Sequence, residues 1–440
     1  RMISSNAEQE AIRGICSQGP GSGPSVIWGP PGTGKTVTMV ETIRQLLRNP
    51  LCRILACAPS NAAADLIATR LGLEPNILFR LYSVSRDVKL LPSKLQDNVL
   101  INSEGSFAVP PLEELEKYHV VVSTCVTAGV LLGVGLRRGH FNYIFIDEAG
   151  QAHEPETLIP MRALADKYTN VVLSGDPKQL PPMIRSPLAL KLGLKKSYLE
   201  RMFELWENQM KKSGVTVFML KDHFRSHPDI IDFSNKNFYQ NKLQYHADPA
   251  ITESMRKFSK LKTPDVHIMF HAVSGKDDRE GRSPSFFNIE EASLVNVYVE
   301  ALLGRENQKL RLTHEHIGVI SPYQAQCGKI LRTFKKNPKM SGIKVGSVEE
   351  FQGQERRVII VSTVRSSVEF IDYDLKHDLG FVADPRRFNV TITRAQALLI
   401  VIGNPLSLSL DPLWRAFLNK VYHGGGWTGK HIDWDPNEPV

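Results

Sequence analysis

Short runs of β-branched and other apolar residues alternate along this chain with longer stretches in which apolar positions recur every three or four residues. A run of the first kind predicts a buried strand, and a stretch of the second kind predicts an amphipathic helix. Strands that alternate with helices usually pair in parallel. The predicted strands lie at 25–28, 54–58, 119–123, 143–146, 170–174, 215–220, 266–270, 317–323, 344–348, 357–363 and 398–403. The pattern therefore predicts an α/β protein with mostly parallel sheets.

Two interruptions of this alternation suggest how the chain is divided. Residues 71–118 contain Pro75, Pro92, Pro110 and Pro111 but also many apolar residues. We interpret them as an insertion rather than a linker. Strand and helix signals weaken again from 185 to 214, where the basic pair Lys211 and Lys212 ends the stretch. Because 440 residues exceed what one core holds, we predict a first domain at 1–213 and a second at 214–440.

Composition narrows the class of protein. Hydrophobic residues make up 42% and charged residues 23%, which is ordinary for a globular protein. The five cysteines are scattered without a Cys-x-x-Cys pair, so we expect reduced core thiols in an intracellular protein. No apolar run approaches the roughly 20 residues of a membrane span, and no signal peptide opens the chain. The net charge of +8 favours a polyanionic partner.

The clearest chemical motif follows the first predicted strand. It has the pattern Gly-x-x-x-x-Gly-Lys-Thr, and a helical pattern at 37–47 comes directly after it. Glycines let successive backbone N–H groups point at an anion, and a helix N-terminus adds its positive end. Lys35 is expected to reach the β- and γ-phosphates of ATP, and the Thr36 hydroxyl to bind Mg²⁺. The predicted nucleotide-binding residues are Gly29, Pro30, Pro31, Gly32, Thr33, Gly34, Lys35 and Thr36.

Two carboxylates end the predicted strand at 143–146, on the sheet edge that also carries the glycine motif. Asp147 is expected to hold Mg²⁺ together with Thr36, and Glu148 to polarise the attacking water. In isolation such a pair would more simply begin a helix as cap and first-turn acid. Gln179, which follows the strand at 170–174, is placed to sense the γ-phosphate. Gln9 on the first helix could read an adenine edge, although a surface role is the simpler alternative.

Only one of the two predicted lobes carries the phosphate-binding motif. We therefore expect the nucleotide to lie in the cleft between the lobes, with arginines of the second lobe completing the site. Arg225 and Arg394 are the simplest choices, and an arginine supplied in this way is worth roughly 10³–10⁵ in rate. Each of them alone would more often be a salt-bridge partner.

The order of these motifs resembles that of the superfamily 1 helicases, and the resemblance extends over nearly the whole chain. The form is similar to superfamily 1B, the group that includes the nonsense-mediated-decay helicases. Three strings resemble most the Armitage/Moloney-leukaemia-virus-10 branch of RNA-silencing helicases. These strings lie at 147–150, 275–288 and 345–355.

The resemblance implies two tandem RecA-like P-loop domains and ATP-driven 5′→3′ movement on single-stranded RNA, with duplex unwinding or protein displacement. It assigns Gln9 to adenine and Gln179 to phosphate sensing, with Gly353 near the γ-phosphate and Glu355 on the ribose. Arg225 and Arg394 become the γ-phosphate arginines. Phe224 stands where related helicases have a tyrosine, so stacking on adenine is retained without a hydroxyl contact.

The same resemblance implies a nucleic-acid face of hydroxyls and backbone amides. Its residues are Pro59, Ser60, Asn61, Ser123, Thr124, Cys125, Ser321, Pro322, Tyr323 and Ser347. Protein partners from RNA-silencing or decay complexes are expected to bind flanking regions. We expect a monomer in the cytoplasm, including ribonucleoprotein granules.

Three other functions fit parts of the pattern. An ATP-gated RNA clamp that does not unwind would use the same motifs. A superfamily 1B DNA helicase is a second alternative, because contacts to 2′-hydroxyl groups cannot be read from the sequence. A P-loop enzyme that is not a motor, such as a kinase, would leave the second lobe without a role.

Overall fold

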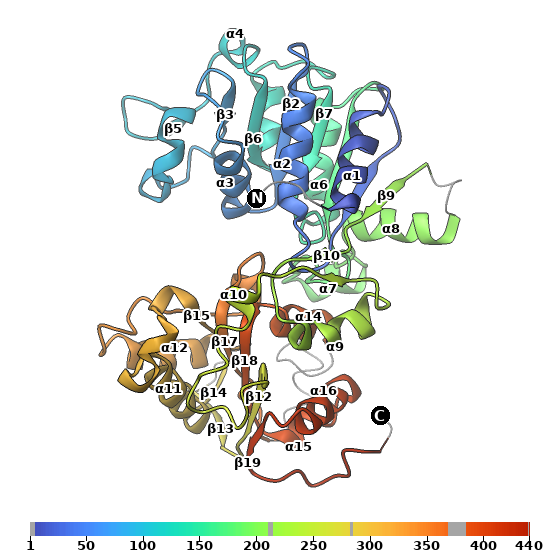
Figure 1. Ribbon diagram of the computed structural model, residues 1–440. Coiled ribbons are helices and arrows are strands. Elements are labelled where there is room, and N and C mark those ends of the chain that lie inside the picture. Colours follow the sequence, from blue (N-terminus) through green and yellow to red (C-terminus); the bar gives the residue numbers. More distant parts are fainter. Residues whose placement is uncertain (1–4, 210–213, 282–284, 368–383, 439) are drawn as a thin grey trace. The chain divides into compact units, whose positions relative to one another are not determined.

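The computed structural model describes residues 5–209, 214–281, 285–367, 384–438 and 440. It divides into two compact units, residues 1–222 and 223–440, each built around a parallel sheet (Figure 1). The α/β class and the mostly parallel sheets predicted from the sequence are confirmed.

The first unit contains a seven-stranded sheet in the order β3-β6-β2-β7-β8-β1-β9, in which every pairing is parallel. The central strands are buried along their whole length, as expected when helices cover both faces. The strands are β1 (Ser25–Trp28), β2 (Ile54–Ala58), β3 (Leu78–Arg80), β6 (Val120–Thr124), β7 (Tyr143–Ile146), β8 (Asn170–Gly175) and β9 (Thr216–Met219).

Helices pack on this sheet through apolar faces. Three of them, α1, α2 and α3, share one hydrophobic cluster with alternate residues of the strands. Helix α8 lies on the opposite face, where its Phe203 ring meets Trp28 edge-on. The helices are α1 (Asn6–Cys16), α2 (Lys35–Leu46), α3 (Asn61–Leu71), α4 (Leu112–Leu115), α5 (Val130–Gly133), α6 (Glu154–Leu164), α7 (Pro187–Lys191) and α8 (Tyr198–Gln209).

The strand at 215–220, which we expected to open the second lobe, belongs to the first sheet instead. It is β9, and it pairs with β1 as an edge strand. A short apolar run carries no signal for the sheet it joins. Here Phe218 packs so closely on α1 that a Cβ at Gly14 would lie 2.5 Å from its ring. The basic pair Lys211 and Lys212 lies outside the described residues.

The segment at 71–118 is also more integrated than an insertion. Its strand β3 pairs in parallel with β6 and extends the main sheet. The rest includes a small hairpin, β4 (Leu100–Ile101) with β5 (Phe107–Ala108), and helix α4. Strand β3 escapes a pattern search because it is three residues long and ends in Arg80. That arginine is fully buried, at 2.8 Å from Asp65 of α3.

The second unit contains a six-stranded parallel sheet in the order β16-β15-β17-β18-β12-β19. These strands are β12 (Ile268–Ala272), β15 (Ile317–Ile320), β16 (Lys344–Gly346), β17 (Arg356–Ser362), β18 (Ala395–Gly403) and β19 (Trp427–Gly429). The main helices are α9 (Pro228–Phe238), α10 (Pro249–Thr252), α11 (Ile289–Leu303), α12 (Gln324–Phe334), α14 (Pro385–Ile392), α15 (Pro405–Leu408) and α16 (Pro412–His423).

Two small ladders accompany this sheet. Strand β10 (Asp222–His223) pairs with β11 (Gln244–Tyr245), and β13 (Asp277–Arg279) pairs in antiparallel fashion with β14 (Phe286–Asn288). Among the residues that the structure describes, no helix is long and apolar enough to cross a bilayer. The five cysteines are free thiols, and four of them are buried.

Candidate nucleotide site

The phosphate-binding motif forms a tight loop between β1 and α2. Its last glycine, Gly34, adopts φ 87°, a left-handed conformation that glycine takes without strain, and caps α2. The first, Gly29, has no room for a side chain, because a Cβ there would lie 2.2 Å from the Cγ of Lys35. The Lys35 ammonium donates to the Gly29 carbonyl at 2.7 Å. The lysine thus sits over the loop at the N-terminus of α2, where phosphate is favoured.

Thr36, Asp147 and Ser174 converge beside this loop from three different elements. The Thr36 hydroxyl donates to Asp147 Oδ2 at 2.8 Å, and the Ser174 hydroxyl donates to Asp147 Oδ1 at 2.7 Å. Asp147 is only 2% exposed. A hydroxyl and a carboxylate are hard oxygen donors of the kind that Mg²⁺ prefers. The two residues predicted to hold Mg²⁺ are therefore in contact and chemically suited to it.

Glu148, the predicted water-polarising residue, has an unusual backbone conformation. Its φ of 51° is left-handed, which is uncommon for a residue other than glycine. Its carboxylate accepts a hydrogen bond from Gln151 Nε2 at 2.6 Å. Strained residues of this kind concentrate at functional sites. Gln151 thus donates to the Glu148 carboxylate, whereas Thr36 and Ser174 donate to that of Asp147.

Gln179 is held by a residue that the sequence did not single out. Asp176 accepts from Gln179 Nε2 at 2.8 Å, from the Trp28 indole at 3.2 Å and from the Lys178 backbone at 3.0 Å. Trp28 directly precedes the phosphate-binding loop, so Asp176 ties the predicted sensor to that loop. The position of Asp176 just after the β8 strand was the available signal. On α1, Gln9 is half-buried and accepts from Arg13 at 3.5 Å.

Three predicted residues of the second unit, Arg225, Glu355 and Arg394, meet at the start of β17 and β18. Arg225 donates to Glu355 and to the Thr393 carbonyl, and Gln396 also donates to Glu355. Burial by itself raises the pKa of Glu355. The charges of Arg225 and Arg394 and the hydrogen bonds from Arg225 and Gln396 outweigh that effect, so the pKa lies below its ordinary value. The contact joins the residue predicted at the ribose to one predicted at the γ-phosphate.

Arg394 is buried within the second unit, with 1% of its surface exposed. Its guanidinium donates to the Val390 carbonyl at 3.0 Å, to the Gln354 carbonyl at 3.4 Å and to the Thr393 hydroxyl at 3.1 Å. Gly353, in the same turn as Gln354, is exposed and has φ 74°.

Phe224, the predicted adenine-stacking residue, is half-buried with its ring 5.8 Å from that of His246.

The predicted nucleic-acid residues of the first unit lie at the ends of β2 and β6 and differ in exposure. Ser60 is exposed and caps α3 by accepting from the Ala63 backbone at 3.2 Å. Asn61 is half-buried and accepts from Arg80 at 3.0 Å, and Pro59 beside it is half-buried too. The remaining three, Ser123, Thr124 and Cys125, are buried. At those three positions a ligand would meet backbone groups more readily than side chains.

In the second unit the corresponding residues are also largely buried. Ser321 and Tyr323 follow β15 and are 0% and 2% exposed, while Pro322 between them is half-buried. The Tyr323 ring packs against Phe286 of β14 at 5.9 Å. Ser347 follows β16 and accepts a hydrogen bond from the Glu350 backbone at 3.4 Å.

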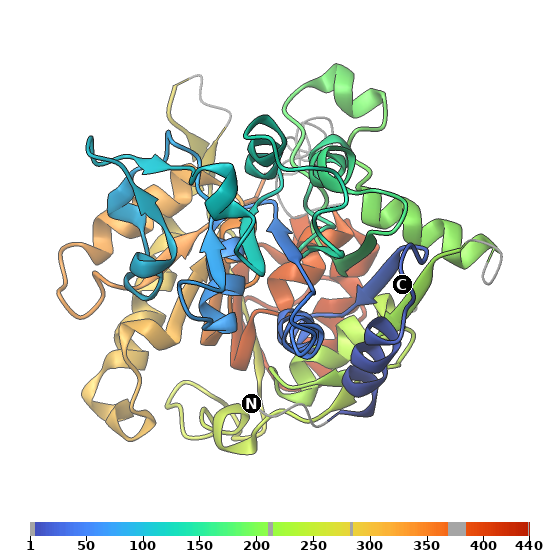
Figure 2. The same ribbon diagram turned by 90° about the horizontal axis from the view of Figure 1, so that it is seen from above.

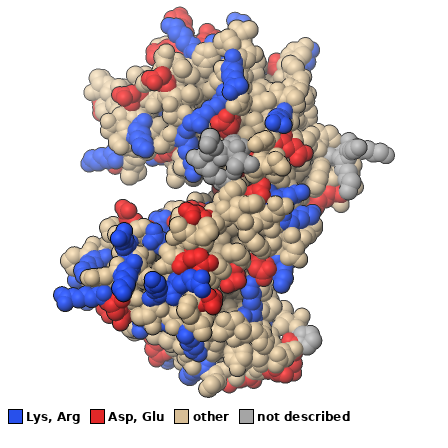
Figure 3. All heavy atoms as spheres, viewed as in Figure 1, with Lys and Arg blue, Asp and Glu red and all other residues tan. Residues whose placement is uncertain are grey.

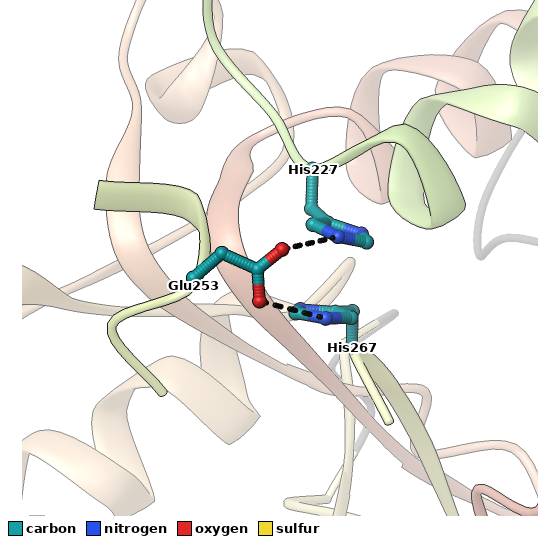
Figure 4. A group of neighbouring side chains, drawn as sticks. All are labelled: His227, Glu253 and His267. Carbon is teal, nitrogen blue, oxygen red and sulfur yellow. Dashed lines mark hydrogen bonds and ion pairs between the residues drawn. The ribbon is translucent and has the colours of Figure 1, made fainter. Parts of the chain in front are cut away.

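A histidine–glutamate cluster in the second unit was not foreseen, because its members are far apart in the sequence (Figure 4). His227 Nε2 lies 3.2 Å from one Glu253 oxygen, and His267 Nε2 lies 3.8 Å from the other. Their side chains are close enough together for metal ligation. The second ring nitrogen of His267 lies 3.1 Å from the Ala397 carbonyl.

Ring geometry favours a hydrogen-bonded network over a metal centre at this cluster. The two imidazoles are stacked with centroids 3.4 Å apart and planes 12° from parallel, so one ion could not lie in both ring planes. His227 Nδ1 accepts from the Asp229 backbone at 3.2 Å, which leaves Nε2 to carry the proton in the neutral ring. Burial, then the neighbouring His267, lowers the pKa of His227. The His227 backbone donates to the Gln396 carbonyl at 2.8 Å, so the cluster supports the strand that follows Arg394.

Comparison with known proteins agrees with the motif pattern. Two family models, each described as "AAA domain", match residues 4–88 with 86–187 and residues 194–406. The Danio rerio protein mov-10-B.1 is 43% identical over 98% of this chain and 44% of its own length. "RNA helicase Mov10l1" of Homo sapiens is 39% identical over 92% of this chain and 34% of its own length. "Probable RNA helicase armi" of Drosophila melanogaster is 35% identical over 91% of this chain and 37% of its own length.

This chain spans less than half the length of these relatives. Among solved structures, "Complex structure of Arterivirus nonstructural protein 10 (helicase) with DNA" aligns with a TM-score of 0.42 at 14% identity, over 90% of this chain and 63% of that one. The three sequence relatives are much more similar to this chain in sequence than that structure is. Together with the two matched domain models, they show that this chain is a close homologue, over nearly all of its length, of the helicases mov-10, Mov10l1 and armi.

Proposed function

We propose that this chain is the ATP-hydrolysing motor of an RNA helicase that moves 5′→3′ along single-stranded RNA. The observation that carries the proposal is the convergence of Lys35, Thr36 and Asp147 at one end of the first sheet, with Glu148 next in the chain. These residues supply a phosphate counter-charge, two Mg²⁺ ligands and a base for water, which are the parts that NTP hydrolysis requires.

Each residue has a separable role in this chemistry. The loop amides and Lys35 would bind the β- and γ-phosphates, and Thr36 and Asp147 would hold Mg²⁺. When bound, Mg²⁺ supplies charge that stabilises the phosphoryl oxygens. Glu148 would orient and deprotonate the attacking water. Gln179 would report the state of the γ-phosphate to Asp176 and Trp28, with which it forms a hydrogen-bonded chain.

The second unit is proposed to contribute arginines to the same nucleotide. Arg225 and Arg394 already share Glu355 as an electrostatic partner. A nucleotide bound by both units would favour a closed arrangement, and hydrolysis would remove that bridge. Alternating grip on the strand would then convert closing and opening into movement along it.

RNA as the substrate rests on the relatives, two of which are named as RNA helicases. Charge is consistent with it, because lysines and arginines gather on the second unit over α12 (Figure 3). The exposed cations at the end of that helix and in the following turn are Arg332, Lys335, Lys336 and Lys339. A role in RNA silencing or decay, action as a monomer in cytoplasmic granules, and protein partners bound through other regions are parts of the same proposal.

The deciding experiment measures ATP hydrolysis alone, with single-stranded RNA and with single-stranded DNA of the same sequence. Stimulation by RNA and weaker stimulation by DNA would support the proposal, and the reverse order would favour a DNA helicase. Strand displacement from duplexes with a 5′ or a 3′ overhang tests direction. Hydrolysis stimulated by RNA without displacement from either duplex would identify an ATP-gated clamp.

A further inference from the structure

Helix α6 of the first unit has an apolar face that the core does not use. Its inward residues, Thr157, Pro160 and Leu164, are buried. Its outward residues Pro155, Leu158 and Ile159 recur at helical spacing yet line an open groove. A helix on the surface of a globular protein normally presents polar residues there.

The other wall of this groove comes from α5, which contacts α6 (Figure 2). Leu132 of α5 lines the groove and is 48% exposed, and its neighbour Val130 is 44% exposed. The two walls approach closely, because a Cβ at Gly129 would lie 3.1 Å from Ile159. The groove has a volume of about 590 Å³, within the usual range for binding sites.

Charge along the groove has one sign. Arg138 and Arg162 line it, both are exposed, and neither forms an ion pair within the described part of the chain. The acids of α6 are engaged elsewhere, since Glu154 binds Arg201 at 2.6 Å and Glu156 lies 3.1 Å from His153. Two unpaired cations beside an apolar floor are complementary to a segment that is apolar and acidic.

We propose that this α5–α6 groove docks a short amphipathic helix from a partner protein, with apolar residues three or four positions apart and carboxylates beside them. Helices of this type bind apolar grooves through residues at i, i+3, i+4 and i+7. The apolar residues would cover Leu158, Ile159 and Leu132, and the carboxylates would meet Arg138 and Arg162. None of these residues belongs to the nucleotide site, so the surface is independent of the proposed function.

The test begins with a phage-displayed library of random 12-residue peptides, selected on the whole chain. The expected result is a set of sequences that combine acidic residues with Leu, Ile or Phe at helical spacing. Their affinity, measured by fluorescence polarisation with synthetic peptides, should fall at least tenfold in a double variant, Arg138→Glu with Arg162→Glu. A matched control, Arg48→Glu with Lys117→Glu, makes the same charge change at exposed positions of the same unit outside the groove and should leave affinity unchanged.

A charge swap separates docking from damage to the fold. Peptides in which the acids are replaced by lysine should bind the double variant and not the original chain. The proposal is overturned if selection enriches no acidic-apolar sequence, or if the double variant and its control bind equally. It is also overturned if the double variant loses poly(U) binding tenfold while poly(U) displaces the peptide, because the groove would then be part of the RNA path.

Discussion

The hydroxyl of Thr36 donates to Asp147 at 2.8 Å, across 111 residues of chain. Parallel pairing makes this contact possible, because β1 and β7 both flank β8 and end at the same edge of the sheet. Through this hydrogen bond the hydroxyl and the carboxylate satisfy each other. A bound Mg²⁺ would take both oxygens as ligands, directly or through water.

Replacement of Thr36 by Ala should therefore weaken the use of Mg²⁺ more than the binding of nucleotide. The Mg²⁺ concentration for half-maximal hydrolysis should rise by about 10–100-fold, the usual cost of disturbing a metal site. Thr36→Ser keeps the hydroxyl and should restore most of the activity. Titration of hydrolysis against Mg²⁺ at saturating ATP measures the effect. An unchanged Mg²⁺ dependence in Thr36→Ala would remove this residue from the metal site.

Glu148→Gln should separate ATP binding from hydrolysis. The amide cannot accept the proton of the attacking water, so the single-turnover rate should fall by about 10²–10⁴-fold, while equilibrium binding of ATP and RNA is retained. Gln151→Ala, which removes only the hydrogen bond to Glu148, should cost much less. If Glu148→Gln instead lost ATP binding, the role of Glu148 would be structural, in holding the left-handed turn at this position.

Glu291 gives a prediction about pH. Burial raises the pKa of this carboxyl to about 8, against hydrogen bonds from Ser362 and the Val364 backbone that lower it. Because the folded pKa exceeds the ordinary value, the folded chain keeps a proton that the unfolded chain loses. The stability of the second unit should then fall as pH rises from about 4.5 to about 8.

The variant Glu291→Gln should flatten this dependence, because its side chain stays neutral at every pH. Between pH 6 and pH 9 its melting temperature should fall by several degrees less than that of the original chain. Glu290→Gln changes an exposed carboxyl next to it and serves as the matched control. Parallel melting curves for Glu291→Gln and the original chain would show that Glu291 is ionised in the folded state.

Local patterns in the sequence were sufficient for part of this site. Lys35 and Thr36 follow a strand and begin a helix, and Asp147 ends a strand, so their neighbours along the chain define their positions. Residues whose role depends on distant partners were missed. Asp176 follows a strand as Asp147 does, but its link to the phosphate-binding loop depends on Trp28, which is distant in the sequence. The burial of Glu291 depends on β17, which lies about 70 residues later.

The strands show the same difference between what local patterns predict and what distant contacts decide. Most strands were found from their apolar runs, yet the run at 215–220 was assigned to the wrong sheet. Which sheet a short run joins depends on side-chain packing, here Phe218 against Gly14 of α1. Strand β3 was missed because its Arg80 reads as polar, although Asp65 neutralises it in the core. Buried pairs of this kind cannot be recognised until both partners are placed.

The remaining prediction concerns Arg394, whose proposed role in catalysis competes with an evident role in folding. Three hydrogen bonds tie its guanidinium to Val390, Gln354 and Thr393. Arg394→Ala would leave those buried acceptors without this donor, which costs about 1–3 kcal/mol per unsatisfied group. If the guanidinium also stabilises charge on the γ-phosphate, single-turnover hydrolysis should fall by roughly 10²-fold or more.

Arg394→Lys distinguishes the two roles. An ammonium can still donate to one or two of the buried carbonyls, so the melting temperature should recover in part. It cannot reproduce the planar fork that binds phosphate oxygens, so the rate of hydrolysis should not recover. Melting and single-turnover hydrolysis should be measured on the same preparations. If the lysine variant regains stability and rate together, or if Arg394→Ala melts early yet hydrolyses ATP normally when folded, Arg394 is a scaffold residue. The phosphate arginine would then be Arg225, or Arg387, which pairs with Glu349 at 3.0 Å.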